Sequence, residues 1–176
     1  MWLNQRGFEM LEDLPEHVTS LRRYAIVLCR DHHDADDLVQ ESLAKAIAAA
    51  DTFDDGRDLR VWLFTILHNT FVSSKRQYAH RTRAAAFLDA ISTEAVALPE
   101  QEKRVEAHHT VRMLSRLSPD QQAAINLVAI EGMSYDEAAE VLGVPVGTLM
   151  SRLARGRERL RRLLDEKPSN LLKIVR

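Results

Sequence analysis

Cysteine, glycine and long apolar runs are scarce in this chain of 176 residues. The single cysteine, Cys29, excludes an internal disulfide, and its apolar context YAIVLC predicts a buried structural thiol. Six glycines are too few for the many turns of an all-β fold. No run approaches the roughly eighteen apolar residues of a membrane helix, and residues 1–9 lack the basic-then-apolar order of a secretion signal. We therefore expect a cytoplasmic protein that does not insert into a membrane.

Charge is distributed unevenly, although the net charge is only −2. Residues 1–56 hold 5 basic and 12 acidic side chains, and residues 57–86 hold 6 and 1. The same order then repeats: residues 87–142 hold 4 basic and 10 acidic side chains, and residues 143–176 hold 9 basic and 3 acidic side chains. Two successive pairs of an acidic and a basic block indicate two modules, each with a basic surface for a polyanion and an acidic surface for another partner.

Apolar residues recur with helical spacing almost throughout, which predicts an all-α protein of two small helical domains joined by a linker. The first domain is expected over residues 11–81. It should contain three helices, over residues 14–29, 34–50 and 61–78. Asp34 is expected to cap the second of these helices, and a turn over residues 54–58 to precede the third. Residues 82–103, rich in alanine and small polar side chains, predict the linker.

The second domain is expected over residues 104–166 and begins with a predicted helix over residues 105–117. Ser118 and Pro119 then mark the start of a helix that ends near Ile130, because serine caps a helix and proline suits its first position.

A short helix, a tight turn and a long helix follow. Ser134 and Glu137 repeat the capping pattern for a helix that stops at Gly143, and the last helix is expected over residues 145–165. This order is a helix-turn-helix signature.

Six arginines lie between Arg152 and Arg162 in the last helix. Its apolar stripe, expected to be buried, consists of Leu149, Leu153, Gly156, Leu160 and Leu163. We expect the arginines on the outside face, opposite this stripe. Such a row of arginines alone is often a solvated surface. Here the tight turn of a helix-turn-helix precedes it, which favours binding of double-stranded DNA. A recognition helix inserts its N-terminal residues into the major groove. The predicted contacts are to base edges from Val146, Thr148, Ser151 and Arg152, and to phosphates from Arg155, Arg159 and Arg162.

The first basic block combines positive charge with aromatic side chains. Phe64, Leu67 and Phe71 are interpreted as core. Thr65, Asn69, Ser73 and Arg76 form one polar face, with Ile66 at its edge. Aromatic groups beside a basic groove suit single-stranded or melted DNA, because every base offers a face for stacking. The candidate residues are Arg57, Arg60, Trp62, Asn69, Ser73, Lys75 and Arg76.

Together these motifs resemble a bacterial RNA polymerase sigma factor of the extracytoplasmic-function class, over about residues 14–165. The family's helix that binds core polymerase is similar to DADDLVQESLAKA. Its segment that melts and reads the minus-ten box is similar to LRVWLFTILHNTF. Its segment that reads the minus-thirty-five element is similar to GMSYDEAAEVLGVPVGTLMSRLARGRERL. The sequence of the first domain is similar to that of the general-stress subgroup. Two departures, Met150 and His68, stand where the family commonly has a basic residue.

The resemblance implies promoter-specific transcription initiation, with core RNA polymerase, promoter DNA and an anti-sigma factor as partners. It also implies that one acidic surface faces the clamp helices of the largest polymerase subunit: Asp36, Asp37, Gln40 and Glu41. Independently of this role, Asp36 and Asp37 favour the start of a helix, and the two explanations are compatible.

Other functions remain open at this point. A sigma-like decoy would bind an anti-sigma factor without reading a promoter, and a dimeric repressor would leave the first domain unexplained. The pairs His32/His33 and His108/His109 lack the spacing of metal ligands, because adjacent residues point to different sides of a helix. Without a nucleophile constellation or a phosphate-binding glycine loop, we expect no catalytic residue, no metal site and no cofactor.

Overall fold

The computed structural model describes residues 5–54, 56–86, 114 and 116–165. All regular elements in these ranges are helical, which confirms the predicted all-α class. The chain divides near residue 100 into two compact units. None of the helices in the described ranges carries an apolar stretch that is long enough to cross a bilayer.

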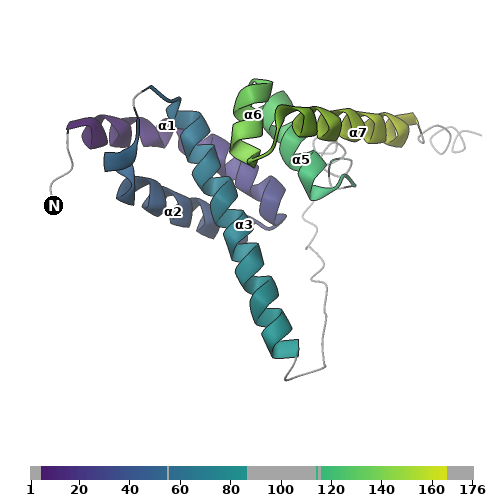
Figure 1. Cartoon of the computed structure of the whole chain (residues 1–176), viewed down its shortest axis with the longest axis horizontal. Coiled ribbons are helices and arrows are strands. Elements are labelled where there is room, and N and C mark those ends of the chain that lie inside the picture. The colour runs from purple at the N-terminus through teal and green to yellow at the C-terminus, as the bar shows by residue number, and fades with distance from the viewer. Residues whose placement is uncertain (1–4, 55, 87–113, 115, 166–176) are drawn as a thin grey trace, which may run out of the picture. The chain divides into compact units, whose positions relative to one another are not determined.

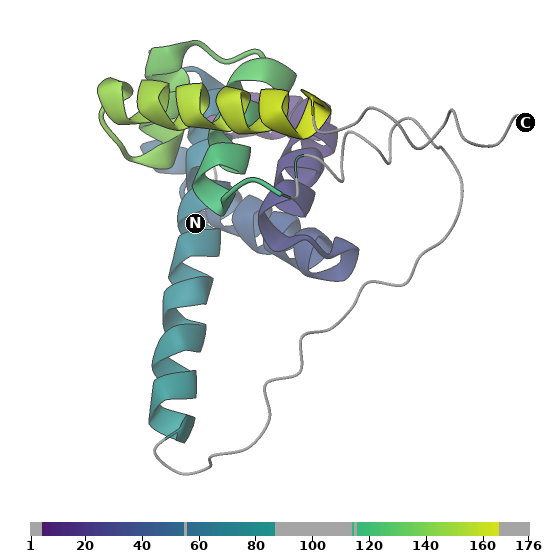
Figure 2. The same cartoon turned by 90° about the vertical axis from the view of Figure 1, so that its right-hand side faces the viewer.

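The first unit contains three long helices and one short one (Figures 1 and 2). They are α1 (Gln5–Cys29), α2 (His32–Ala48), the 3-10 turn η1 (Ala50–Thr52) and α3 (Leu59–Ala86). α2 returns alongside α1, α3 packs against both, and the C-terminal part of α3 projects beyond them in both views. α1 and α3 are longer than predicted. α3 continues into the segment predicted as linker, most of which, residues 87–103, lies outside the described residues.

The core of the first unit is centred on Tyr24 and Phe64, both fully buried. Their ring centroids lie 5.4 Å apart, and the Tyr24 hydroxyl is 3.0 Å from Nδ1 of His68. Burial strongly raises the pKa of Tyr24, so its hydroxyl stays protonated. The prediction that Phe64 and Leu67 are core residues is confirmed, whereas Phe71 is only partly buried.

The cap of α2 differs from the prediction. Asp31, rather than Asp34, is the N-cap, because its Oδ1 accepts hydrogen bonds from the backbone N–H groups of His33 (2.8 Å) and Asp34 (2.9 Å). These bonds lower the pKa of Asp31. Asp34 lies in the first turn, where its charge still favours the helix dipole.

In the described part of the second unit, α5 (Pro119–Ile125) continues into one π-helical turn, η2 (Asn126–Ile130). The sequence predicted a single regular helix to Ile130. Ser118 is the N-cap and Pro119 is the first helical residue, as predicted, and Gln121 completes a capping box with Ser118. The helix predicted over residues 105–117 lies mostly outside the described residues.

Helices α6 (Tyr135–Leu142) and α7 (Val146–Asp165) follow along the chain. The capping box predicted for α6 is present: the Ser134 N–H donates to Glu137 Oε2 (2.7 Å), and the Glu137 N–H donates to Ser134 Oγ (3.2 Å). α7 packs against α5 where Gly156 lets the helices approach. A Cβ at Gly156 would lie 2.7 Å from Cδ1 of Ile125.

The turn between α6 and α7 depends on Gly143. Its φ of 60° lies in the left-handed region. The Gly143 N–H donates to Glu140 O (3.1 Å), and the Val144 N–H donates to Ala139 O (3.1 Å). These two bonds form a Schellman motif, which ends α6 and redirects the chain within three residues.

Gly143→Ala should destabilise the fold, because a left-handed conformation costs a residue with a Cβ about 1–2 kcal/mol. We expect a lower midpoint of urea denaturation, followed by circular dichroism. Gly147→Ala is the matched control. Gly147 has no positive φ and a Cβ there would meet no atom within 4 Å, so this change should be neutral or slightly stabilising. Equal loss in both variants would contradict the role of Gly143.

Candidate nucleic-acid interface

Three predicted phosphate contacts lie exposed along α7: Arg155, Arg159 and Arg162. Arg162 Nε donates to Glu158 Oε1 at 2.9 Å. Arg155 and Arg159 make no ion pair with any residue that the structure describes. The predicted apolar stripe is confirmed, since Leu149, Leu153, Gly156 and Leu163 are buried and Leu160 is partly buried. α7 therefore presents a row of guanidinium groups with little internal compensation.

Arg152 is the exception to the predicted outward row. Its side chain is only 25% exposed, and its Nη2 lies 2.9 Å from Oδ2 of Asp120 on α5. The prediction that Arg152 points away from the core is wrong. At 100° per residue, Arg152 lies only about 60° from Leu149, beside the apolar stripe and not opposite it. The row of arginines thus follows the flank of α7 beside α5.

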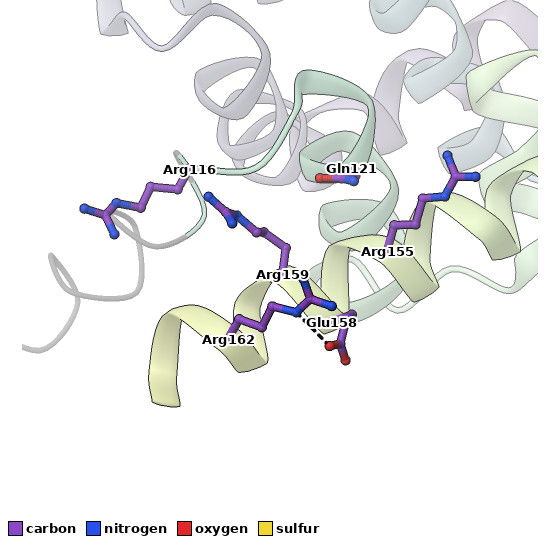
Figure 3. A pocket seen from close by; sticks show the side chains of 6 residues that line it. All are labelled: Arg116, Gln121, Arg155, Glu158, Arg159 and Arg162. Carbon is purple, nitrogen blue, oxygen red and sulfur yellow. Dashed lines mark hydrogen bonds and ion pairs between the residues drawn. The ribbon is translucent and has the colours of Figure 1, made fainter. Parts of the chain in front are cut away.

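This flank forms one wall of a shallow crevice of about 400 Å³ (Figure 3). The lining residues are Arg116 and Gln121 on one side and Arg155, Glu158, Arg159 and Arg162 on α7. Four arginines and one glutamate leave an excess of three positive charges. The only ion pair drawn among them joins Arg162 to Glu158.

The predicted base-reading residues lie in the first two turns of α7. Val146 and Thr148 are partly buried, and Ser151 is exposed. The Ser151 hydroxyl donates to Thr148 O at 2.8 Å, so its oxygen remains an acceptor. Met150 is 52% exposed, which places an apolar side chain on this surface.

The candidate residues of the first basic block do not share one face. Trp62, Asn69, Ser73 and Arg76 fall within about 60° of one another around α3, opposite the buried side of the helix. Arg60 and Lys75 lie on the other side, over the rings of Phe64 (5.7 Å) and Phe71 (4.8 Å). Arg57 precedes the helix in a turn closed by its N–H to Asp54 O (2.9 Å).

The exposed face of α3 is polar with one aromatic end. Asn69, Ser73 and Arg76 are exposed, and Trp62 is partly buried against Phe53, with ring centroids 4.9 Å apart. This packing fixes the indole at the start of the helix. A base that stacked on it would meet hydrogen-bonding side chains along the next three turns.

The acidic residues of α2 have local partners. Asp36 binds Arg22 of α1 through two hydrogen bonds of 2.6 and 3.2 Å, and Arg22 lowers the pKa of this carboxyl. Asp37 lies 3.3 Å from Nδ1 of His33, and Glu41 lies 2.7 Å from Nζ of Lys45. Gln40, Asp37 and Glu41 are exposed, whereas Asp36 is held against α1.

The Cys29 thiol is held in its unreactive, protonated form. Cys29 is partly buried, and burial raises the pKa of its thiol to about 11, so the nucleophilic thiolate is rare at neutral pH. Among the described residues, no three histidine, cysteine or acidic side chains gather in a group that suits a metal ion.

Three charged residues of these surfaces were not predicted from the sequence: Arg22, Asp120 and Arg116. Arg22 and Asp36 are 14 positions apart, and Arg152 pairs with Asp120 across a turn and a helix. Arg116 precedes α5 and meets the α7 row only in the folded unit. Periodicity within one helix carries no signal for any of these contacts.

The two units match known domain models in the expected order. Residues 14–68 match the sigma2 domain of PhyR, and residues 110–160 match sigma-70 region 4. These two domains define the class of the sigma factors, which is not a family of enzymes.

Individual relatives define the family further. ECF RNA polymerase sigma factor EcfG of Rhodopseudomonas palustris is 40% identical over 156 residues, covering 87% of this chain and 83% of the relative. The sigma factor RpoE of Bartonella quintana, solved with the anti-sigma factor NepR, is 37% identical with a TM-score of 0.75, covering 91% and 99%. CnrH, solved with the cytosolic domain of CnrY, is 33% identical with a TM-score of 0.64, covering 94% and 92%. This chain belongs to the family of ECF RNA polymerase sigma factors, which confirms the resemblance.

Proposed function

We propose that this chain binds core RNA polymerase in the cytoplasm and directs it to stress-response promoters. The observation that carries the proposal is the exposed arginine row on α7, directly after the Schellman turn at Gly143. A helix in this position inserts its first turns into the major groove while its later residues meet phosphates. Val146, Thr148 and Ser151 are assigned to base edges of the minus-thirty-five element, and Arg155, Arg159 and Arg162 to the backbone. Arg152 lies beside the base-edge residues, where Asp120 holds it.

The first unit is assigned to the melted minus-ten strand. The exposed face of α3 with Trp62, Asn69, Ser73 and Arg76 supports this role, because it combines a fixed aromatic ring with hydrogen-bonding groups. Arg57, Arg60 and Lys75 lie off this face and are assigned to the neighbouring phosphates. The domain boundaries proposed for these roles are residues 11–81 and 104–166, separated by the linker over residues 82–103.

The exposed acidic side of α2 is assigned to the largest polymerase subunit. Asp37, Gln40 and Glu41 supply the accessible groups, and Asp36 is oriented by Arg22. Their negative charge also opposes DNA, so we expect the free chain to bind promoters weakly and to gain specificity once polymerase covers this surface.

We further infer that an anti-sigma factor holds the chain inactive, because the solved relatives RpoE and CnrH are bound to NepR and CnrY. The same observation supports a second candidate function, that of a decoy that binds an anti-sigma factor without reading promoters. Gel filtration with purified core polymerase separates the two. A sigma factor elutes with polymerase and retains a promoter fragment on it, whereas a decoy does neither.

A further inference from the structure

The crevice between α7 and the start of α5 carries positive charge that its own carboxylate does not balance. Arg116, Arg155 and Arg159 make no ion pair with any described residue. Glu158, the one carboxylate of the crevice, already engages Arg162 (2.9 Å) and Arg161 (3.5 Å) through its two oxygens. Guanidinium groups gathered around one hollow repel one another, and an anion placed among them relieves that repulsion.

Gln121 adds a neutral donor to the same hollow. Its Oε1 accepts the Ser118 N–H (3.2 Å) in the capping box of α5. The amide group of Gln121 is thereby oriented, and its Nε2 remains available to donate. Guanidinium forks with an amide donor are the groups that bind phosphate oxygens.

We propose that this crevice holds one backbone phosphate of the duplex, and that Arg116 and Gln121 extend the DNA surface beyond α7. The inference rests on the proposed binding of duplex DNA by the second unit. A DNA phosphate is favoured over a free anion because the crevice is open and its α7 wall is the same arginine row that leads into the proposed major-groove contacts.

The test measures binding of the full chain to a random-sequence 30-base-pair duplex by fluorescence anisotropy, from low to moderate salt. One lost phosphate contact lowers the slope of log K against log salt by about 0.9. Arg116→Ala should therefore reduce the slope by about that amount and the affinity roughly eight-fold at 0.1 M salt. Arg116→Lys should retain the slope, because the charge is kept.

Two further variants separate a site from a general charge effect. Arg157→Ala removes an exposed arginine of α7 that does not line the crevice, so its slope should stay near that of the wild type. Gln121→Glu keeps the capping box but replaces the donor with a carboxylate, so it should weaken binding at least as much as Arg116→Ala.

The outcomes are distinguishable. If the wild-type chain fails to bind the duplex at any salt concentration, the proposed duplex binding fails and this inference fails with it. If the wild type binds but Arg116→Ala has the same slope and affinity as the wild type or as Arg157→Ala, only the crevice assignment is overturned. It is also overturned if Arg116→Ala weakens calorimetric binding of inorganic phosphate while leaving duplex binding unchanged, because the crevice then serves a free anion.

Discussion

Replacing Phe64 with alanine should cost the first unit about 3–5 kcal/mol, the usual loss for a large aromatic side chain in a core. Phe64 is fully buried and packs on Tyr24, which joins α3 to α1. A loss of this size is comparable to the whole stability of many small domains. We therefore expect the variant to be largely unfolded in its first unit at 37 °C.

Tryptophan fluorescence reports this unit, because Trp62 packs on Phe53 within it and residues 104–166 contain no tryptophan. Urea titration of Phe64→Ala should shift the fluorescence midpoint strongly. Asn69→Ala is the matched control, since Asn69 is exposed on the opposite side of the same helix, and its effect should stay within about 0.5 kcal/mol. A Phe64→Ala variant that unfolds with the wild-type midpoint would show that the core lies elsewhere.

The double variant Arg155→Ala/Arg159→Ala should lose most of its affinity for duplex DNA. Both arginines are exposed and have no described carboxylate partner, so each is available to neutralise one phosphate. Two lost contacts lower the slope of log K against log salt by about 1.8 and the affinity roughly sixty-fold at 0.1 M salt. Anisotropy titrations over a range of salt concentrations measure both quantities.

Arg157→Ala/Arg161→Ala provides the control with the same loss of charge. Arg157 and Arg161 are exposed on the other flank of α7, outside the crevice. Their removal should change the slope little. Equal slopes for the two double variants would mean that only the net charge of the unit matters, and that the face carrying Arg155 and Arg159 has no special role.

The helices and their order could be predicted from the sequence because each carries a local signal. The caps at Ser118 and Ser134 and the helix end at Gly143 act within a few residues, and all three were found in the expected places. The cap of α2 was misplaced by three residues because Asp31 and Asp34 are equally good capping residues, and the sequence alone does not rank them.

The candidate surfaces were predicted less completely, because their geometry depends on contacts between helices. Asp120 draws Arg152 toward α5, and Arg22 holds Asp36 against α1, so both of these predicted contact residues are ion-paired to a neighbouring helix. On α3, the candidate residues were chosen by type, and the helix places Arg60 and Lys75 away from Trp62 and Asn69. Residue type thus indicated the chemistry of the surface, while packing determined which groups share it.

The chain is proposed to start transcription at specific promoters. Purified core RNA polymerase is incubated with fragmented genomic DNA with and without the chain, and the 5′ ends of the transcripts are sequenced. We expect new 5′ ends that depend on the chain and share paired upstream elements at a fixed spacing, and we expect their loss with Arg155→Ala/Arg159→Ala. An unchanged set of 5′ ends, from a chain that still binds an anti-sigma factor, would contradict the account and identify a decoy.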